Sequence, residues 1–187
     1  MIPFRSYGAL SADATISDPA LVCLIGAAGS GKSTLARRWW ADSQVLGLDR
    51  FRAMVSDDAG CPQASGDAAF ALQTVLEARL VRGLTSVIDA TNTEAVHRGT
   101  LLNLARRYDV PTVALVVPTP LPICLERNAR RPGNRRVPDV VVLRQHADVI
   151  AALPGLSREG FNRVLFADGH HHTESAGGST RGQLVTG

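Results

Sequence analysis

The segment LVCLIGAAGSGKSTLARRWW, residues 21–40, constrains the fold more than any other part of the chain. A short apolar run is followed by a loop of small residues and then by the apolar spacing of a helix, as in a parallel α/β unit. The loop fits the pattern G-x-x-x-x-G-K-[ST], with Gly26, Gly31, Lys32 and Ser33 at the fixed positions. Glycines let several backbone N–H groups converge on phosphate oxygens, and the helix adds its positive N-terminal end. The segment therefore predicts a phosphate-binding loop.

Lys32 is the only lysine in the chain, and every other strongly basic residue is arginine. A compact ammonium group on a flexible stem reaches the β- and γ-phosphates of a nucleotide more readily than a broad guanidinium group. Ser33 offers a hydroxyl to Mg²⁺, and Thr34 supports it, so we expect ATP and Mg²⁺ as cofactors. The expected nucleotide-binding residues are Gly26, Ala27, Ala28, Gly29, Ser30, Gly31, Lys32, Ser33 and Thr34. Motors, switches and kinases all use this loop, so it does not by itself identify a reaction.

Apolar runs alternate with helical patterns along the chain. Strands are predicted at Leu21–Ile25, Gln44–Leu48, Thr85–Ile88, Thr112–Val117 and Arg163–Phe166. Helices are predicted at Lys32–Trp40, Ala68–Val81, Ala95–Tyr108, Leu121–Arg130 and Val140–Leu153. This strict alternation predicts an α/β fold on a mostly parallel sheet.

Composition places the chain among ordinary globular domains. It has 187 residues, of which 45% are hydrophobic and 20% charged, and its formal net charge is +3. Cys23 and Cys124 lie in apolar runs, and together with Cys61 they have no metal-ligand spacing, so we expect free thiols in a reducing compartment. No apolar run approaches the roughly 20 residues of a membrane helix, and the N-terminus does not look like a secretory signal. We expect a cytoplasmic protein with no membrane contact and no clear protein partner.

Asp49 is the first candidate for the chemistry, at the predicted end of the second strand in VLGLDRFR. Ligands of parallel sheets bind at the carboxyl ends of the strands, so Asp49 could accept a proton from an incoming hydroxyl group. Arg52 would share its face if a helix begins there, and could hold an anionic group of the acceptor. The position of Asp49 alone supports equally well the alternative, in which Asp49 is a surface residue that caps the next helix.

Asp89 is the second candidate, because it follows an apolar strand in SVIDATN. A carboxylate beside a phosphate-binding loop commonly holds Mg²⁺ through bound water. Thr91 and Asn92 add polar groups on the same edge. The alternative interpretation is a strand-end turn stabilised by Asp and Asn side chains, and the two are compatible.

The third candidate is an arginine cluster in CLERNARRPGNRRVP. Its members are Arg127, Arg130, Arg131, Arg135 and Arg136. Arg127 and Arg131 are four residues apart, which predicts that they share one helix face. Arginines stabilise the charge that develops during phosphoryl transfer, and a flexible Pro/Gly segment could close over ATP as a lid. A solvated surface helix is the plain alternative, and the cluster could also follow a nucleic-acid backbone.

Together these pieces resemble the kinase module of bacterial polynucleotide 5′-kinases found in RNA-repair enzymes. The resemblance runs from Ile16 to Phe166 through LVCLIGAAGSGKSTLA, LDRFRAMVSDD, VIDATN, CLERNARR and EGFNRV. It implies a P-loop NTPase kinase fold, with a central, mostly parallel five-stranded sheet flanked by helices and an arginine-rich lid. The activity that it implies is transfer of the ATP γ-phosphate to a 5′-OH end of RNA or DNA, with Mg²⁺.

The resemblance also implies roles for the candidates. Lys32 and Ser33 would hold phosphates and metal, with Asp89 near the metal. Asp49 would be the general base, and Arg52 would contact the nucleic-acid end.

In the lid, Arg127 and Arg131 would bind the ATP phosphates, with Arg135 or Arg136 as a further contact. The segment RPGNRRV is one residue longer than in such modules, so the choice between Arg135 and Arg136 stays open. Gly47 and Leu48 precede Asp49 where such modules often carry serines.

We expect three parts of the chain: an N-terminal extension over residues 1–20, a P-loop kinase domain over residues 21–167, and a tail over residues 168–187. We expect the tail to be disordered, because it consists largely of Gly, Ser, Thr and His and has little to bury. We interpret the histidines at 170–172 in that tail as solvated residues and not as a metal site. The phosphatase and ligase modules of the repair enzymes do not fit in this sequence, so the acceptor could differ. A small-molecule kinase acting on an antibiotic, a nucleotide sugar or a similar alcohol is the first alternative. An ATP-binding regulatory module with little turnover is the second.

Overall fold

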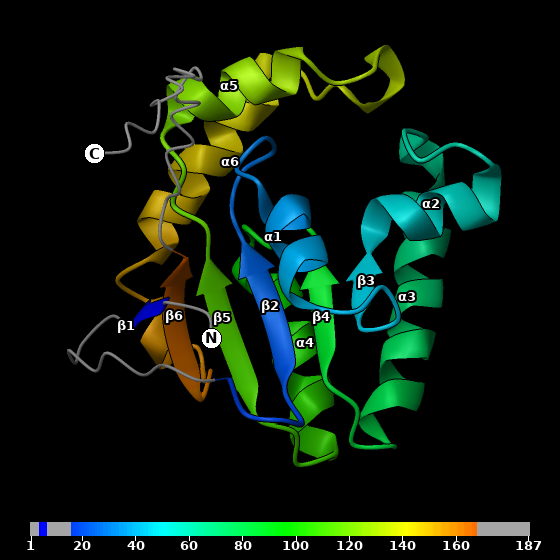
Figure 1. The fold of residues 1–187 in the computed structure, drawn as a ribbon, viewed down its shortest axis with the longest axis vertical. Helices are drawn as coiled ribbons and strands as arrows, with labels where there is room; N and C mark the ends of the chain where they lie inside the picture. The colour runs from blue at the N-terminus through cyan, green and yellow to red at the C-terminus, as the bar shows by residue number, and fades with distance from the viewer. Residues whose placement is uncertain (1–3, 7–15, 168–187) are drawn as a thin grey trace, which may run out of the picture.

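The fold is described from a computed structural model, which covers residues 4–6 and 16–167. A sheet of six strands forms its centre, in the order β1-β6-β5-β2-β4-β3 (Figure 1). The strands are β1 (Phe4–Ser6), β2 (Leu21–Ile25), β3 (Val45–Gly47), β4 (Ser86–Asp89), β5 (Thr112–Val116) and β6 (Arg163–Ala167). Strands β2 to β6 pair in parallel, and β1 pairs with β6 in the antiparallel direction. The predicted α/β class and the five parallel strands are confirmed, and the short strand β1 is an addition that the sequence patterns did not predict.

In the described part of the chain, six α-helices surround the sheet. They are α1 (Lys32–Trp39), α2 (Leu48–Ser56), α3 (Ser65–Leu80), α4 (Ala95–Arg107), α5 (Leu121–Ala129) and α6 (Asp139–Ala152), with short 3₁₀ turns at Pro62–Ala64, Gly133–Arg135 and Leu156–Arg158. No helix in the described part of the chain is both long and apolar enough to cross a membrane.

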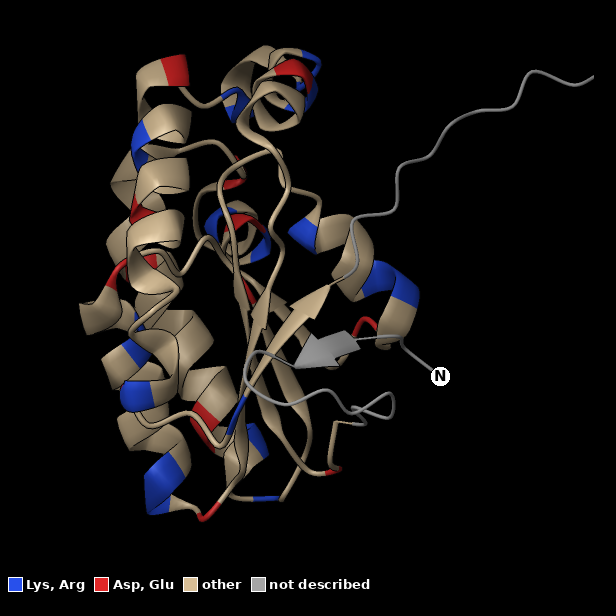
Figure 2. Cartoon of the chain, turned by 90° about the vertical axis from the view of Figure 1, so that its left-hand side faces the viewer, with Lys and Arg blue, Asp and Glu red and all other residues tan. Residues whose placement is uncertain are grey.

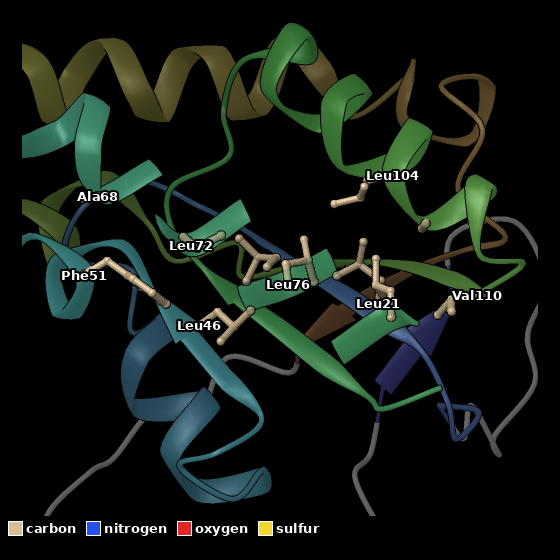
Figure 3. Close-up of a cluster of buried hydrophobic side chains, with 11 residues drawn as sticks. Leu21, Leu46, Phe51, Ala68, Leu72, Leu76, Leu104 and Val110 are labelled. Carbon is tan, nitrogen blue, oxygen red and sulfur yellow. The ribbon is translucent and has the colours of Figure 1, made fainter. Parts of the chain in front are cut away.

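Alternation along β2 divides the core between the two faces of the sheet. Val22 and Leu24 belong to the cluster that α1 covers through Ala36. Leu21 belongs to the opposite cluster, which α3 and α4 cover through side chains such as Leu76 (Figure 3). All five residues of β2 are buried, as expected for a central strand of a parallel sheet covered on both faces.

Strand β2 is also the point at which the order of the strands in the sheet reverses. Strand β4 lies on one side of β2 and β5 on the other, with β3 and β6 beyond them. Parallel sheets bind ligands outside the carboxyl ends of the strands at such a point. The phosphate-binding loop leaves the end of β2 and therefore lies at this position.

The region after β3 differs from the sequence prediction. Strand β3 ends at Gly47, and Leu48 already begins α2, so the strand is shorter than predicted. Among the described strands β3 lies at the edge and pairs only with β4, and its last partner is Asp89 at the end of β4, so the pairing stops at Gly47. Asp49 consequently lies in the first turn of α2, not at the end of a strand.

Candidate active site

The phosphate-binding loop has the backbone that its glycines predict. Gly29 and Gly31 have φ angles of 81° and 96°, in the left-handed region that glycine adopts without strain. A Cβ atom on Gly29 would lie 2.2 Å from the carbonyl oxygen of Cys124 in α5. Gly29 is therefore needed twice, for its dihedral angles and for the close approach of the loop to α5.

Lys32 lies within this loop and is 7% exposed. Its Nζ donates hydrogen bonds to the carbonyl oxygens of Gly26 (2.7 Å) and Ala27 (2.8 Å) and to Oγ of Ser30 (3.2 Å). Burial lowers the pKa of Lys32 from 10.5 to about 8, and the Asp89 carboxylate opposes part of that shift. The ammonium group is thus held at the loop by carbonyl oxygens that phosphate oxygens can replace.

Polar groups from other elements hold the loop in place. Asn92 donates from Nδ2 to the carbonyl oxygen of Leu24 at 2.8 Å, and the Thr91 carbonyl accepts from the Gly26 N–H at 3.1 Å. Gln145 of α6 accepts from the Ala28 N–H at 2.9 Å. Asn92 and Thr91 were predicted at this edge from DATN, whereas Gln145 belongs to no motif and was missed.

Behind DATN lies a buried arginine that sequence reasoning also missed. Arg98 of α4 is 1% exposed and donates from Nη1 to the carbonyl oxygens of Asn92 (2.9 Å) and Thr93 (2.7 Å). Its Nε and Nη2 bind both carboxylate oxygens of Glu159, at 2.7 and 2.6 Å. Arg98 therefore supports the segment that positions the loop. Its place in a helical pattern looks like an ordinary surface position, so no sequence signal marks it.

A cavity of about 350 Å³ opens at the carboxyl end of the sheet, between the loop, α1, α2 and the segment from Arg127 to Arg136, which we call the arginine-rich segment. Figure 2 shows charges of both signs on the helices around this end. The predicted site residues that line the cavity are Ala28, Lys32, Ser33, Asp49, Arg52, Asp89, Arg131 and Arg135. Arg127, Arg136 and Thr34 do not line it. The structure thus brings the three candidate motifs together in one place.

Asp49 is held between two arginines in this cavity. Its Oδ1 accepts from Arg52 Nη1 at 2.7 Å, and its Oδ2 accepts from Arg135 Nη2 at 3.0 Å. Arg52 is fixed further by a bond from Nε to Oγ of Ser65 at 3.1 Å. The N-cap of α2 is Gly47, and no side-chain capping bond is made there. The alternative role of Asp49 as a helix cap is therefore wrong.

The arginine-rich segment differs in detail from its prediction. Helix α5 ends at Ala129, so Arg131 lies beyond the helix and does not share a helix face with Arg127. Pro132 explains the end, because proline disfavours helical geometry at the residue before it. Arg131 lines the cavity, whereas Arg127 points Nη1 towards Gly31, 3.4 Å from where a Cβ atom would lie.

Arg135 and Arg136 also differ from each other. Arg135 reaches Asp49, whereas Nη2 of Arg136 lies 3.8 Å from Oδ1 of Asp139 at the start of α6.

The arginine-rich segment reaches across the carboxyl end of the sheet and meets the turn after α2 (Figure 1). Asn134 donates from Nδ2 to Oδ1 of Asp58 at 2.9 Å, and the same oxygen accepts from the Gly60 N–H at 2.8 Å. A Cβ atom on Gly60 would lie 1.8 Å from the Asn134 carbonyl oxygen. We call Asp58, Gly60 and Asn134 the clasp. It joins segments far apart in the sequence, and no motif predicts it.

Ser33 and Asp89 suit a metal ion of the magnesium type. Among the described residues, no three His, Cys, Asp or Glu side chains gather as a ligand set. Mg²⁺ does not need such a set, because it keeps several waters and is held by one or two protein oxygens together with substrate phosphates. Both side chains line the cavity beside Lys32. A hydroxyl and a carboxylate at this position fit that chemistry.

Residues 21–156 match the model of a protein family described as an AAA domain, and the chain belongs to this family. Its fold is that of P-loop kinases, a family of ATP-binding proteins. No curated protein matches the chain.

Solved structures show the same fold. A chain of the Pnkp1/Rnl/Hen1 RNA repair complex is 21% identical with a TM-score of 0.63, over 92% of this chain and 55% of that one. A chain of a second Pnkp1/Rnl/Hen1 structure is 27% identical with a TM-score of 0.51, over 60% and 40%. The AvrRxo1-ORF1:-ORF2 complex with ATP gives 17% identity and a TM-score of 0.58, over 75% and 50%. The chain therefore spans about half the length, or less, of these neighbours.

Proposed function

We propose that the protein transfers the γ-phosphate of ATP to the 5′-hydroxyl end of RNA or DNA, with Mg²⁺ as cofactor. One observation carries this proposal: the Asp49 carboxylate, held by Arg52 and Arg135, shares a cavity with Lys32 of the phosphate-binding loop. A base for a hydroxyl and a cation for the ATP phosphates are the two groups that such a transfer needs.

In the proposed reaction, the acceptor hydroxyl loses its proton to Asp49 as its oxygen bonds to the γ-phosphorus. The bond from that phosphorus to the β,γ-bridging oxygen breaks, and ADP leaves. Arg52 and Arg135 orient the Asp49 carboxylate, because each donates a hydrogen bond to one of its two oxygens. A general base of this kind contributes about 10²–10⁴-fold to the rate.

Lys32 and Arg131 bind the other reactant, ATP. Lys32 exchanges its carbonyl acceptors for the β- and γ-phosphate oxygens, and Arg131 approaches the same phosphates from the arginine-rich segment. Ser33 and Asp89 would hold Mg²⁺, which, when bound, neutralises charge that develops on the phosphate oxygens. Arg127, which faces Gly31 at the start of α1, would strengthen the positive end of that helix.

The charges that line the cavity support an anionic acceptor. Six basic side chains and three acidic ones line it, and Val45, Leu48 and Val137 are the larger apolar side chains. A neutral small alcohol would be expected to bind in a largely apolar pocket with few polar groups. A nucleic-acid end suits the observed lining better, because its phosphates match the excess of basic groups.

The experiment is transfer of labelled γ-phosphate from ATP·Mg²⁺ to short RNA and DNA strands that carry a 5′-OH. We expect labelled oligonucleotide from the unmodified protein and a loss of at least 10²-fold in Asp49→Asn with ATP binding retained. Asp42→Asn is the matched control, because Asp42 lines the same cavity but its carboxylate contacts no arginine among the described residues.

Three outcomes would contradict the proposal in different ways. Normal turnover in Asp49→Asn removes Asp49 from the mechanism. No label on nucleic acid, with transfer to a small alcohol, supports the small-molecule kinase. ATP binding without transfer to any acceptor supports the regulatory module.

A further inference from the structure

The cavity is also lined along α1, where the helix leads away from the phosphate-binding loop, and at the start of α2. Arg37 and Arg50 line this end together with Asp42 and Val45. Arg37 is four residues after Ser33, which places both on one face of α1, about 6 Å apart along the helix axis. The lining therefore runs from the phosphate-binding loop to a second basic region.

The basic side chains at this end lack partners of the kind that Lys32, Arg52 and Arg135 have. Lys32 bonds to its own loop, and Arg52 and Arg135 share Asp49. Among the described residues, Arg37 makes no hydrogen bond or ion pair, and Arg50 contacts only the Asp42 carbonyl oxygen, at 3.4 Å. Two guanidinium groups that face one cavity without a carboxylate partner are suited to an anion, and guanidinium matches phosphate geometry in particular.

We propose that Arg37 and Arg50 bind a phosphodiester group of the acceptor strand, beyond the nucleotide whose 5′-hydroxyl reacts. This inference rests on the proposed function and narrows its substrate class, from any 5′-hydroxyl end to a preference for strands of at least three nucleotides, which carry a phosphodiester group beyond the 3′-phosphate of the reacting nucleotide. Arg52, beside Asp49, would bind the phosphate of the reacting nucleotide itself. The subsite is sequence-independent, because it contacts the backbone and no base.

The test compares a nucleoside 3′-monophosphate with a 5′-OH hexanucleotide as acceptors in Arg37→Gln/Arg50→Gln. We expect the KM for the hexanucleotide to rise at least tenfold, while the KM values for the monophosphate and for ATP stay within twofold. The dependence of hexanucleotide binding on salt should weaken as well, because two phosphate contacts are lost.

Arg38→Gln is the matched control. Arg38 is adjacent to Arg37 in α1, but its guanidinium lies 5.4 Å from the Trp39 ring centroid and does not line the cavity. Removal of this positive charge should leave the KM for the hexanucleotide unchanged. Arg37, Arg38 and Arg50 are all exposed, so the variants should fold, which thermal unfolding checks.

The outcomes separate this inference from the proposed function. If the hexanucleotide is phosphorylated but the double variant keeps its KM and its salt dependence, the subsite is wrong and the kinase remains. If Arg38→Gln has the same effect as the double variant, general charge explains the result and the subsite is also wrong. If no nucleic acid is phosphorylated at all, the proposed function fails and the subsite fails with it.

Discussion

Arg135 Nη2 lies 3.0 Å from Asp49 Oδ2 and joins two segments that are 86 residues apart in the sequence. Both side chains are 46% exposed, and such pairs contribute only about 0–1 kcal/mol to stability. The importance of the pair therefore lies in placement, since it brings the arginine-rich segment onto the side of the cavity where the acceptor would react. Arg136, one residue further on, turns to Asp139.

We predict that Arg135→Gln lowers kcat/KM at least tenfold, because Asp49 loses one of its two guanidinium partners. Arg136→Gln should stay within twofold, because among the described residues the Arg136 guanidinium pairs with Asp139 and not with Asp49. Steady-state kinetics with a 5′-OH oligonucleotide checks both. Equal effects of the two substitutions would show that the cluster acts through its total charge and not through the contact with Asp49.

The clasp gives a second prediction. In Gly60→Ala the new methyl group would lie 1.8 Å from the Asn134 carbonyl oxygen, so the two segments must move apart. Arg135 is next to Asn134, and we expect the KM for the acceptor to rise about fivefold or more, with ATP affinity retained. Gly133→Ala is the control on the same segment, because no neighbouring atom of the described part of the chain lies within 4 Å of its Cβ position. An unchanged KM in Gly60→Ala would show that the clasp does not position Arg135.

The sequence was sufficient for the features that depend on local pattern. Strand, loop and helix around Lys32 follow from the glycine spacing and from apolar periodicity. Asp89 at the end of β4 follows from the position of an acidic residue after a buried strand. These features depend on neighbours in the chain or on a repeating geometry, so they can be predicted from a single sequence.

The features that the sequence did not predict correctly depend on contacts between distant segments or on where a helix stops. The shared face of Arg127 and Arg131 assumed that α5 continues, although Pro132 was available as a stop signal. The approach of Gly60 to Asn134 requires two backbones to meet in space, and glycine has many other uses in turns. Asp49 was correctly placed at the carboxyl end of the sheet, but its position in α2 depends on where β4 stops pairing with β3.

Thiol reactivity tests the burial of the cysteines. Burial raises the pKa of Cys23 to about 12 and raises the pKa of Cys124, while Cys61 is half-buried on the turn before α3. Because the thiolate is the reactive form, we predict that one thiol reacts with an aromatic disulfide reagent in the native protein and that all three react in denaturant. Cys61→Ser should abolish the native reaction. Rapid reaction in that variant would mean that α5 or β2 opens.

The pKa of Lys32 gives a prediction on pH dependence. Its folded pKa of about 8 lies below the ordinary value of 10.5, because burial disfavours the charged form. Between these values the unfolded chain holds more protons than the native protein, so unfolding free energy should rise with pH from about 8 to 10.5. ATP phosphates favour the charged ammonium, so ATP binding should take up a proton above pH 8 and weaken by up to about tenfold per pH unit. Calorimetry at pH 9 in two buffers of different ionisation enthalpy measures that proton directly. Denaturant unfolding of Lys32→Met supplies the control, since its stability should lose this contribution, and an equal rise with pH in both proteins would assign the effect to another group.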